Sequence, residues 1–351
     1  MTGGSLDPVP TDASHDPRGS LTGGCSGPLS EVYDVALLDC DGVLYLQHEP
    51  VEHSAQAVRA VLDGGMRVAY VTNNASRPVA EIAGQLRGFG LPATTADVVT
   101  SGQAAARLVT DAVGAGGPVL VLGAEGLREQ VAEAGLRQVD GAADGPAAVL
   151  QGYDAEMTYA RLAEGALAVR EGALWVACNL DATIPTPRGL LPGNGSLVAV
   201  LSTATGCAPV VAGKPEPALH EEAVRRTAAR RPLVVGDRLD TDIEGAVRAG
   251  SPSLLVLTGV AGPDDLPGAP PAQRPTYLAR DLRGLLEPHP PVRVADGEAF
   301  AGDWTARVDG DDITVRGTGD PLNGLRAACG VGWARWPQGH ANPRIRGLPE
   351  L

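Results

Sequence analysis

Residues 32–42 are VYDVALLDCDG, a nearly continuous apolar run that ends in two aspartates separated by one residue. Such a run is typical of a strand that is buried on both faces of a parallel sheet. Because side chains alternate along an extended chain, Asp39 and Asp41 should point to the same side, at the carboxyl end of the strand. Open α/β sheets bind ligands at that edge, so the pair indicates metal chemistry. The alternative is an ordinary turn or a loop cation site, since Asp and Gly are common in turns.

Short apolar runs alternate with amphipathic stretches along most of the chain, which predicts parallel strands joined by crossover helices and the α/β class. After the first strand, residues 54–62 have helical spacing and residues 68–71 form a second strand. From residue 93 to 209 the alternation is independent, and then the first pattern resumes with strands at 210–212, 233–235 and 254–257. We therefore expect one α/β domain inserted into another.

These patterns divide the chain into five parts. We expect a Rossmann-like parallel-sheet core at 31–92 and 210–262, with an inserted α/β domain at 93–209. Residues 1–30 are rich in Gly, Ser, Pro and Asp, which predicts a disordered tail, and 263–291 is a proline-rich linker or surface wrap. Residues 292–351 should form a small C-terminal module of unknown role, with a hairpin turn at Asp309-Gly310 and a helix over 322–329.

Composition excludes several classes of function. The formal charge of −14 opposes binding of a nucleic acid polymer, because such binding uses Lys and Arg against phosphates. No apolar run is long enough to span a membrane, and the first thirty residues do not resemble a secretory signal. The five cysteines are scattered, odd in number and never in a CxxC pair, which favours the reducing cytoplasm over a disulfide framework or zinc site. Cys40 should be a buried inert thiol, with redox sensitivity as the alternative.

Three further polar segments follow predicted strands. They are Thr72-Asn73-Asn74, Lys214 within GKPEP, and Asp237 with Asp240 and Asp242. Taken singly, such segments are often turn residues, a solvated lysine and helix-capping aspartates. Their position at successive strand ends of one domain is more specific, because the carboxyl ends of parallel strands meet at one edge of the sheet.

In this order, DCDG at 39–42, TNN at 72–74, GKPEP at 213–217 and GDRLDTDI at 236–243 resemble the four motifs of the haloacid dehalogenase superfamily. The subgroup resembled is subfamily IIA, which contains the NagD-type nucleotide phosphatase, eukaryotic phosphoglycolate phosphatase and 4-nitrophenyl phosphatase. The likeness covers about residues 32–260, and the inserted domain corresponds to that subgroup's α/β cap. The resemblance implies a Mg²⁺-dependent phosphatase that acts on a small phosphorylated metabolite through an aspartyl phosphate.

By this resemblance, Asp39 is the nucleophile and a metal ligand. Asp41 is the general acid and base, and it also offers its backbone carbonyl to the metal. Asp237 completes the protein ligands, and Asp242 acts from behind them, orienting Lys214 or the water around the metal. The residues that the resemblance assigns to the metal site are Asp39, Asp41, Asp237 and Asp242.

The resemblance also implies a substrate-binding set. The residues expected to contact the transferred phosphoryl group are Thr72, Asn73, Asn74 and Lys214. In the cap, Asn179 and Asp181 end a predicted strand and match a segment that faces the active site in relatives, so we expect them near the substrate. A polar turn before a proline is the alternative for these two residues.

Physical chemistry supports these roles independently. A carboxylate that attacks a phosphate dianion meets repulsion of several kcal/mol at about 4 Å, which a divalent cation and a lysine must offset. Oxygen-rich ligands imply Mg²⁺. Aspartate can form an acyl phosphate, and a second carboxylate two residues away can protonate the leaving oxygen and later deprotonate water.

Several points stay open at this level. Sugar phosphates, phosphoglycolate, glycerol phosphate and nucleoside monophosphates are all candidate substrates, whereas the similar pyridoxal phosphatases carry a histidine near Ile184 that this chain lacks. A phosphotransferase on the same fold and a non-catalytic phosphometabolite-binding regulator are the alternatives, although the complete carboxylate set counts against the regulator. We further expect no membrane partner and, as an open expectation, a homodimer through the cap.

Overall fold

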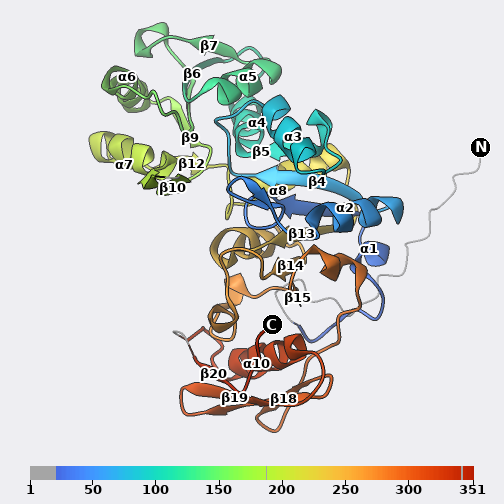
Figure 1. Cartoon of the computed structure of the whole chain (residues 1–351). Helices are drawn as coiled ribbons and strands as arrows, with labels where there is room; N and C mark the ends of the chain where they lie inside the picture. Colours follow the sequence, from blue (N-terminus) through green and yellow to red (C-terminus); the bar gives the residue numbers. More distant parts are fainter. Residues whose placement is uncertain (1–20, 187, 341–342) are drawn as a thin grey trace, which may run out of the picture.

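The core sheet is built from the apolar runs found in the sequence. In the computed structural model, which describes residues 21–186, 188–340 and 343–351, six strands pair in the order β15-β14-β13-β1-β4-β5 (Figure 1). All neighbouring strands are parallel. The strands are β1 (Val35–Asp39), β4 (Arg67–Thr72), β5 (Val98–Thr100), β13 (Pro232–Gly236), β14 (Ser253–Val256) and β15 (Tyr277–Ala279).

Helices cover both faces of the core sheet, as the continuous apolar strands require. Alternation along β1 sends Ala36 and Leu38 to one helix layer, and Val35 and Leu37 to the other. The first layer contains α1 (Leu29–Val32), α2 (Ser54–Asp63) and α3 (Val79–Gly88), and the second contains α4 (Ser101–Val113), α8 (Ala218–Thr227) and α9 (Glu244–Arg248). Short turns of helix complete this part of the chain: η1 (Thr95–Asp97), η3 (Leu239–Ile243), η4 (Pro263–Asp265), η5 (Pro271–Gln273) and η6 (Leu282–Leu286).

A second parallel sheet, the cap sheet, has the order β12-β9-β8-β6-β7. Its strands are β6 (Pro118–Leu122), β7 (Arg137–Val139), β8 (Ala148–Gln151), β9 (Leu174–Ala177) and β12 (Val210–Val211). Its helices are α5 (Glu125–Glu133), α6 (Tyr159–Arg170), α7 (Asn194–Thr205) and the short η2 (Ala142–Asp144). Two small hairpins add β2 (Tyr45–Leu46) with β3 (Glu49–Pro50), and β10 (Thr183–Thr186) with β11 (Gly189–Pro192). The α/β class with a parallel core sheet is therefore confirmed.

Strand pairing shifts two of the expected domain boundaries. Residues 98–100 form β5 and pair with β4, so they belong to the core sheet and not to an insertion that begins at residue 93. Residues 210–211 form β12 and pair with β9, so they belong to the cap sheet and not to the core. The alternation of strands and helices does not reveal which sheet a strand joins, because both sheets use the same short apolar runs.

The expected tail and linker are both more ordered than their composition suggests. Residues 1–20 lie outside the described part of the chain, but Leu21 and Leu29 are buried, and Cys25 forms a backbone bridge with His289. The prediction of a disordered tail is therefore wrong for residues 21–30. Within the proline-rich segment, Tyr277–Ala279 is the sixth strand of the core sheet, so this segment wraps the core and also completes it.

The C-terminal module is a five-stranded sheet packed on one long helix, at the opposite end of the core from the cap (Figure 1). Its elements are β16 (Arg293–Ala295), β17 (Glu298–Ala301), β18 (Trp304–Asp309), β19 (Asp312–Arg316), α10 (Pro321–Arg335) and β20 (Ile345–Arg346). The hairpin predicted at Asp309-Gly310 is confirmed, with Asp309 opposite Asp312. Leu255 and Leu278 of the core sheet share a hydrophobic cluster with the module, which fixes the module to the core. None of the helices in the described part of the chain has the length and apolar character of a membrane span.

Candidate active site

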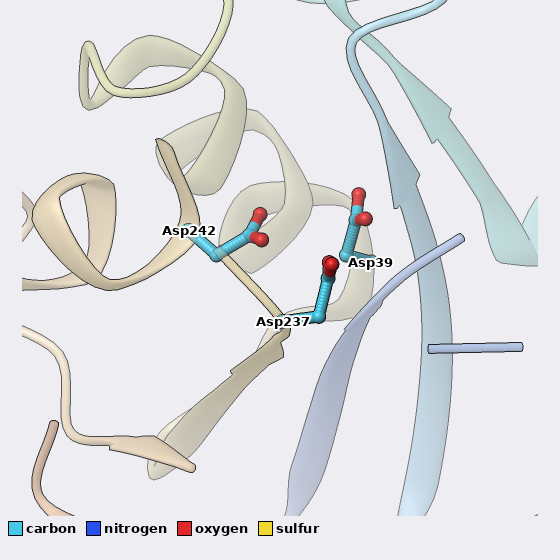
Figure 2. A group of neighbouring side chains, drawn as sticks. All are labelled: Asp39, Asp237 and Asp242. Carbon is cyan, nitrogen blue, oxygen red and sulfur yellow. The ribbon is translucent and has the colours of Figure 1, made fainter. Parts of the chain in front are cut away.

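Three carboxylates converge at the carboxyl edge of the core sheet. Each of Asp39, Asp237 and Asp242 offers an oxygen atom, and these atoms lie within 4.8 Å of one another. Asp39 ends β1, Asp237 follows β13, and Asp242 lies in η3, so neighbouring strands deliver the group to one place (Figure 2). Such a cluster of like charges is unfavourable unless cations balance it.

Lys214 is the cation that the chain itself supplies. Its Nζ donates hydrogen bonds to Oδ1 of Asp39 and, over 2.6 Å, to Oδ1 of Asp242. Burial opposes the charge of Lys214, but Asp242 and Asp39 outweigh burial and raise the pKa of its ammonium group. Burial raises the pKa of the Asp39 carboxyl, and Lys214 opposes that rise. Lys214 therefore pairs with two of the three carboxylates, and its single positive charge does not balance the cluster.

Asp237 carries the clearest sign of a metal site. Its Oδ2 accepts a hydrogen bond of 2.7 Å from the backbone N–H of Val260. Its Oδ1 is buried and has no hydrogen-bond partner among the residues that the structure describes. A buried carboxylate oxygen without a partner is unfavourable, and burial raises the pKa of Asp237 to about 6. Together with Asp39, this oxygen fits a small divalent cation that prefers oxygen ligands, such as Mg²⁺.

Two glycines let the backbone close around Asp237. A Cβ atom at Gly42, where φ is +83°, would lie 2.3 Å from Oδ2 of Asp237. A Cβ atom at Gly259 would lie 2.0 Å from the same oxygen, and the neighbouring Thr258 donates a hydrogen bond of 2.5 Å to the carbonyl of Gly42. Sequence reasoning missed the segment 258–260. Its position directly after a predicted strand of the core was the available signal.

Asp242 differs from the other two carboxylates because both of its oxygens are engaged. Oδ1 accepts from Lys214, and Oδ2 accepts a hydrogen bond of 3.2 Å from the backbone N–H of Arg238. Among the four residues expected at the metal, Asp242 is thus the one whose contacts match an orienting role. It holds the ammonium group of Lys214 beside Asp39.

Asp41 lies outside the three-carboxylate cluster, and its side chain is exposed. Desolvation raises the pKa of its carboxyl, while backbone N–H groups of Gln47 and Gly42 and the charge of Arg238 oppose the rise. A carboxyl group with a raised pKa at the mouth of a site can carry a proton for a leaving group. Cys40, between the two aspartates, is buried as expected, and burial raises the pKa of its thiol.

The second motif contributes two side chains whose donor groups have no acceptor among the residues that the structure describes. The hydroxyl oxygen of Thr72 accepts a hydrogen bond of 3.1 Å from the N–H of Asn74, so the hydroxyl proton can be donated elsewhere. Oδ1 of Asn74 accepts from both the N–H and the hydroxyl of Ser76, each over 2.9 Å. The amide NH₂ of Asn74 is then available to an acceptor such as a phosphoryl oxygen.

Asn73 connects three segments. Its Oδ1 accepts from the N–H of Lys214 over 2.8 Å, and its Nδ2 donates to the Lys214 carbonyl over 3.2 Å. Its own carbonyl accepts from the hydroxyl of Ser101 and, over 2.8 Å, from Nδ2 of Asn179 in the cap. The Asn73 side chain is therefore used to hold the Lys214 loop, and Asn179 is used to hold the cap. The direct contact expected between the Asn73 side chain and a phosphoryl group stays a prediction, and Asn179 lies beside this site, bonded to Asn73.

Asp181 reaches the same region from the cap. Its N–H donates to Oδ1 of Asn179 over 3.2 Å, and the Asn73 side chain is near enough to its carboxyl to lower the pKa of that group. Burial raises the pKa of Asp181, whereas Arg238 and Lys214 lower it. The expectation that Asp181 lies near the substrate stays a prediction.

Family models match most of the chain in three segments. A haloacid dehalogenase-like hydrolase model matches residues 36–137, and a second model of that hydrolase type matches residues 211–285. A GCN5-related N-acetyltransferase-like domain matches residues 301–348, within the C-terminal module.

Individual proteins of this hydrolase type are also similar to the chain. D-glycerol 3-phosphate phosphatase of Mycobacterium tuberculosis is 48% identical over 292 residues, which cover 83% of this chain and 81% of that protein. A 5'-nucleotidase of Bacillus subtilis is 41% identical over 66% of this chain and 89% of its own length. The crystal structure of glycerol phosphate phosphatase from M. tuberculosis in complex with magnesium has a TM-score of 0.82 and 46% identity, covering 91% of this chain and 94% of that one.

Proposed function

The chain belongs to the haloacid dehalogenase-like hydrolase family, and we propose that within this family it hydrolyses a small polyol phosphate, glycerol 3-phosphate first among them. It is a magnesium-dependent phosphoric monoester hydrolase. The polyol substrate is supported by the share of this chain that aligns with a glycerol phosphate phosphatase. The sequence of D-glycerol 3-phosphate phosphatase aligns with 83% of the chain, whereas that of the nucleotidase aligns with 66%.

We assign the chemical steps to Asp39 and Asp41. A carboxylate oxygen of Asp39 attacks phosphorus, the bond from phosphorus to the leaving oxygen breaks, and Asp41 gives that oxygen its proton. Asp41 then takes a proton from water, whose oxygen attacks the aspartyl phosphate and releases inorganic phosphate and Asp39. Mg²⁺, held by Asp39, Asp237 and the Asp41 carbonyl, would supply positive charge against the negative charge of the phosphoryl group.

The remaining residues hold the phosphoryl group and the groups that act on it. The Thr72 hydroxyl, the Asn74 amide and the Lys214 ammonium would donate to phosphoryl oxygens. Asp242 and Asn73 would position Lys214, one through the ammonium group and the other through the backbone. Asn179 would fix the cap over the site by its bond to the Asn73 carbonyl.

We also propose that two copies associate through the cap. Leu167 of α6, Val200 of α7 and Val210 of β12 are each about half exposed, at 50%, 48% and 49%. Helix α7 carries no charged residue along its twelve positions, and β12 is an edge strand of the cap sheet. Exposed apolar residues near an open sheet edge support an interface there. The five free cysteines support our placement of the enzyme in the cytoplasm.

A substrate panel tests the proposal. The full-length protein is assayed with both enantiomers of glycerol 3-phosphate, phosphoglycolate, a hexose phosphate and nucleoside monophosphates, with Mg²⁺ and with a chelator. We expect the highest kcat/KM for a glycerol phosphate enantiomer, with activity lost on chelation and restored by Mg²⁺. Higher kcat/KM for any other ester would refute the polyol substrate. Product analysis with competing alcohols separates hydrolysis from phosphoryl transfer.

A further inference from the structure

The mouth of the site contains more negative than positive charge. Arg238 is a cation near the cap segment, and its positive charge lowers the pKa of both Asp181 and Asp41. Its guanidinium group is already paired with Asp240, with Nε to Oδ1 at 3.1 Å and Nη2 to Oδ2 at 2.8 Å. A bidentate pair of this kind satisfies both partners. The arginine that interacts with Asp181 is therefore already committed to another carboxylate.

Hydrogen bonds fix the position of Asp181 relative to the phosphoryl site. Asn179 binds the carbonyl of Asn73, and Asp181 follows two residues later with its N–H on Oδ1 of Asn179. The carbonyl of Asp181 accepts a hydrogen bond of 2.9 Å from Gly195, which anchors the segment to the start of α7. Asn73 in turn holds Lys214, whose ammonium group contacts Asp39. The Asp181 carboxylate is thus tied to the residues around the phosphoryl group, on the side of the cap.

We propose that Asp181 selects substrates by charge, excluding phosphate esters whose leaving group carries a second negative charge. This inference rests on the proposed phosphatase function and deepens it. A leaving group that extends toward the cap meets the carboxylate of Asp181, which repels a carboxylate or a second phosphate. The same carboxylate can accept hydrogen bonds from the hydroxyl groups of an uncharged polyol. The favoured class is therefore phosphate esters of neutral hydroxylated alcohols.

A pair of nearly isosteric substrates isolates this effect. Glycerol 3-phosphate and 3-phosphoglycerate differ in that one carries a hydroxymethyl group where the other carries a carboxylate. For the wild-type protein we expect much higher kcat/KM with glycerol 3-phosphate. In Asp181→Asn, which keeps the shape and removes the charge, the ratio of the two kcat/KM values should shift toward 3-phosphoglycerate by about tenfold, as expected for one partly screened charge.

A second variant changes the charge near the leaving group by freeing Arg238. Asp240→Asn removes the partner of the Arg238 guanidinium and leaves this cation free to meet an anionic leaving group. The ratio should again shift toward 3-phosphoglycerate. Two controls accompany these variants. Asp181→Glu keeps the charge and should keep the preference, and Glu156→Gln removes one charge from an exposed position of the cap and should change neither substrate.

The outcomes separate this inference from the proposed substrate. If both Asp181→Asn and Asp240→Asn fold, as checked by circular dichroism, and neither changes the ratio, charge selection by Asp181 is refuted. If the wild-type protein hydrolyses neither glycerol 3-phosphate nor 3-phosphoglycerate, the polyol substrate is wrong. Charge selection is then measured on phenyl phosphate against 4-carboxyphenyl phosphate, where equal kcat/KM values for the wild-type protein would overturn it without any variant.

Discussion

At the carboxyl edge of the core sheet, one lysine is hydrogen-bonded to two of three clustered carboxylates, whereas Arg326 and Trp333, two buried side chains of the C-terminal module, donate to backbone carbonyls outside the module. Oδ1 of Asp237 is buried and unpartnered within the described residues. In the module, Nη2 of Arg326 donates to the carbonyl of Leu278 over 2.7 Å, and Nε1 of Trp333 donates to that of Leu266 over 2.8 Å. The first arrangement leaves charge unbalanced, whereas these two donors at the junction are both satisfied.

This difference separates residues that serve chemistry from residues that serve stability. The carboxylate group is unfavourable in the folded protein alone and becomes balanced when a cation binds. The junction of module and core is favourable without any ligand. Substitutions at the catalytic edge should therefore change activity more than folding, and substitutions at the junction should do the reverse.

The largest expected effect is that of Asp39→Asn, which tests the catalytic side of the comparison. The amide cannot attack phosphorus as the carboxylate does, so kcat should fall by about a thousandfold or more. The fold should persist, because Lys214 keeps its hydrogen bond of 2.6 Å to Asp242. Turnover of 4-nitrophenyl phosphate and thermal unfolding measure the two quantities. Turnover retained in a pure, folded variant would remove Asp39 from the mechanism.

Lys214→Met should lower both activity and stability, because this catalytic residue also balances buried charge. Without its ammonium group, Asp39 and Asp242 lose their common hydrogen-bond donor. Breaking a buried ion pair by removing one partner typically costs about 3–5 kcal/mol. Denaturant unfolding in a chelator should show a loss of this order, and Mg²⁺ should restore part of it. An unchanged free energy of unfolding in both conditions would mean that Lys214 is not needed to balance the cluster.

The pH dependence of the metal-free protein sharpens the comparison. Burial raises the pKa of Asp237 to about 6, above its value in the unfolded chain. A raised carboxyl pKa contributes stability that is complete below the unfolded pKa and is lost as pH rises through about 6. From the difference between its ordinary pKa of 3.8 and about 6, the loss is at most about 3 kcal/mol.

Mg²⁺ provides the control for this pH effect. Bound to the Asp237 carboxylate, the cation should remove the loss, and its apparent affinity should weaken below about pH 6, because protons compete for the same oxygen. Unfolding curves at pH 4 to 8, with Mg²⁺ and with chelator, give the difference between the two states directly. A difference that does not grow with pH would contradict the assignment of Asp237 to the metal site.

The catalytic edge could be predicted from the sequence, because its residues follow strands whose apolar character is unambiguous. Asp39 and Asp237 end or follow runs of buried residues, and the parallel topology brings such positions together. The roles of Asn73 and Asn179 could not be predicted in this way. Whether an amide binds a ligand or holds a neighbouring loop depends on which partner lies within reach, and this is set by packing of the cap.

The N-terminal segment and the proline-rich segment were harder to predict for a different physical reason. Their contacts with the rest of the chain are long-range, so local pattern carries little information about them. Leu21 and Leu29 lie in a segment of low-complexity composition, yet both are buried by partners distant in sequence. Tyr277–Ala279 is a three-residue strand among prolines, and only its pairing with β14 identifies it as part of the core sheet.

Arg326→Met is the smallest expected effect and tests the stability side of the comparison. Arg326 is 5% exposed, and its guanidinium group donates to the Leu278 carbonyl and to Oδ1 of Asn323. Methionine keeps most of the packing and removes these donors, so the free energy of unfolding should fall by about 1–2 kcal/mol. At 25 °C kcat should be unchanged, since the side chain lies at the end of the core opposite the cap. Arg335→Met, at an exposed position of the same helix, is the matched control and should leave both quantities unchanged. A change in kcat for Arg326→Met alone would mean that the junction also shapes the catalytic edge, and that the two regions are not independent.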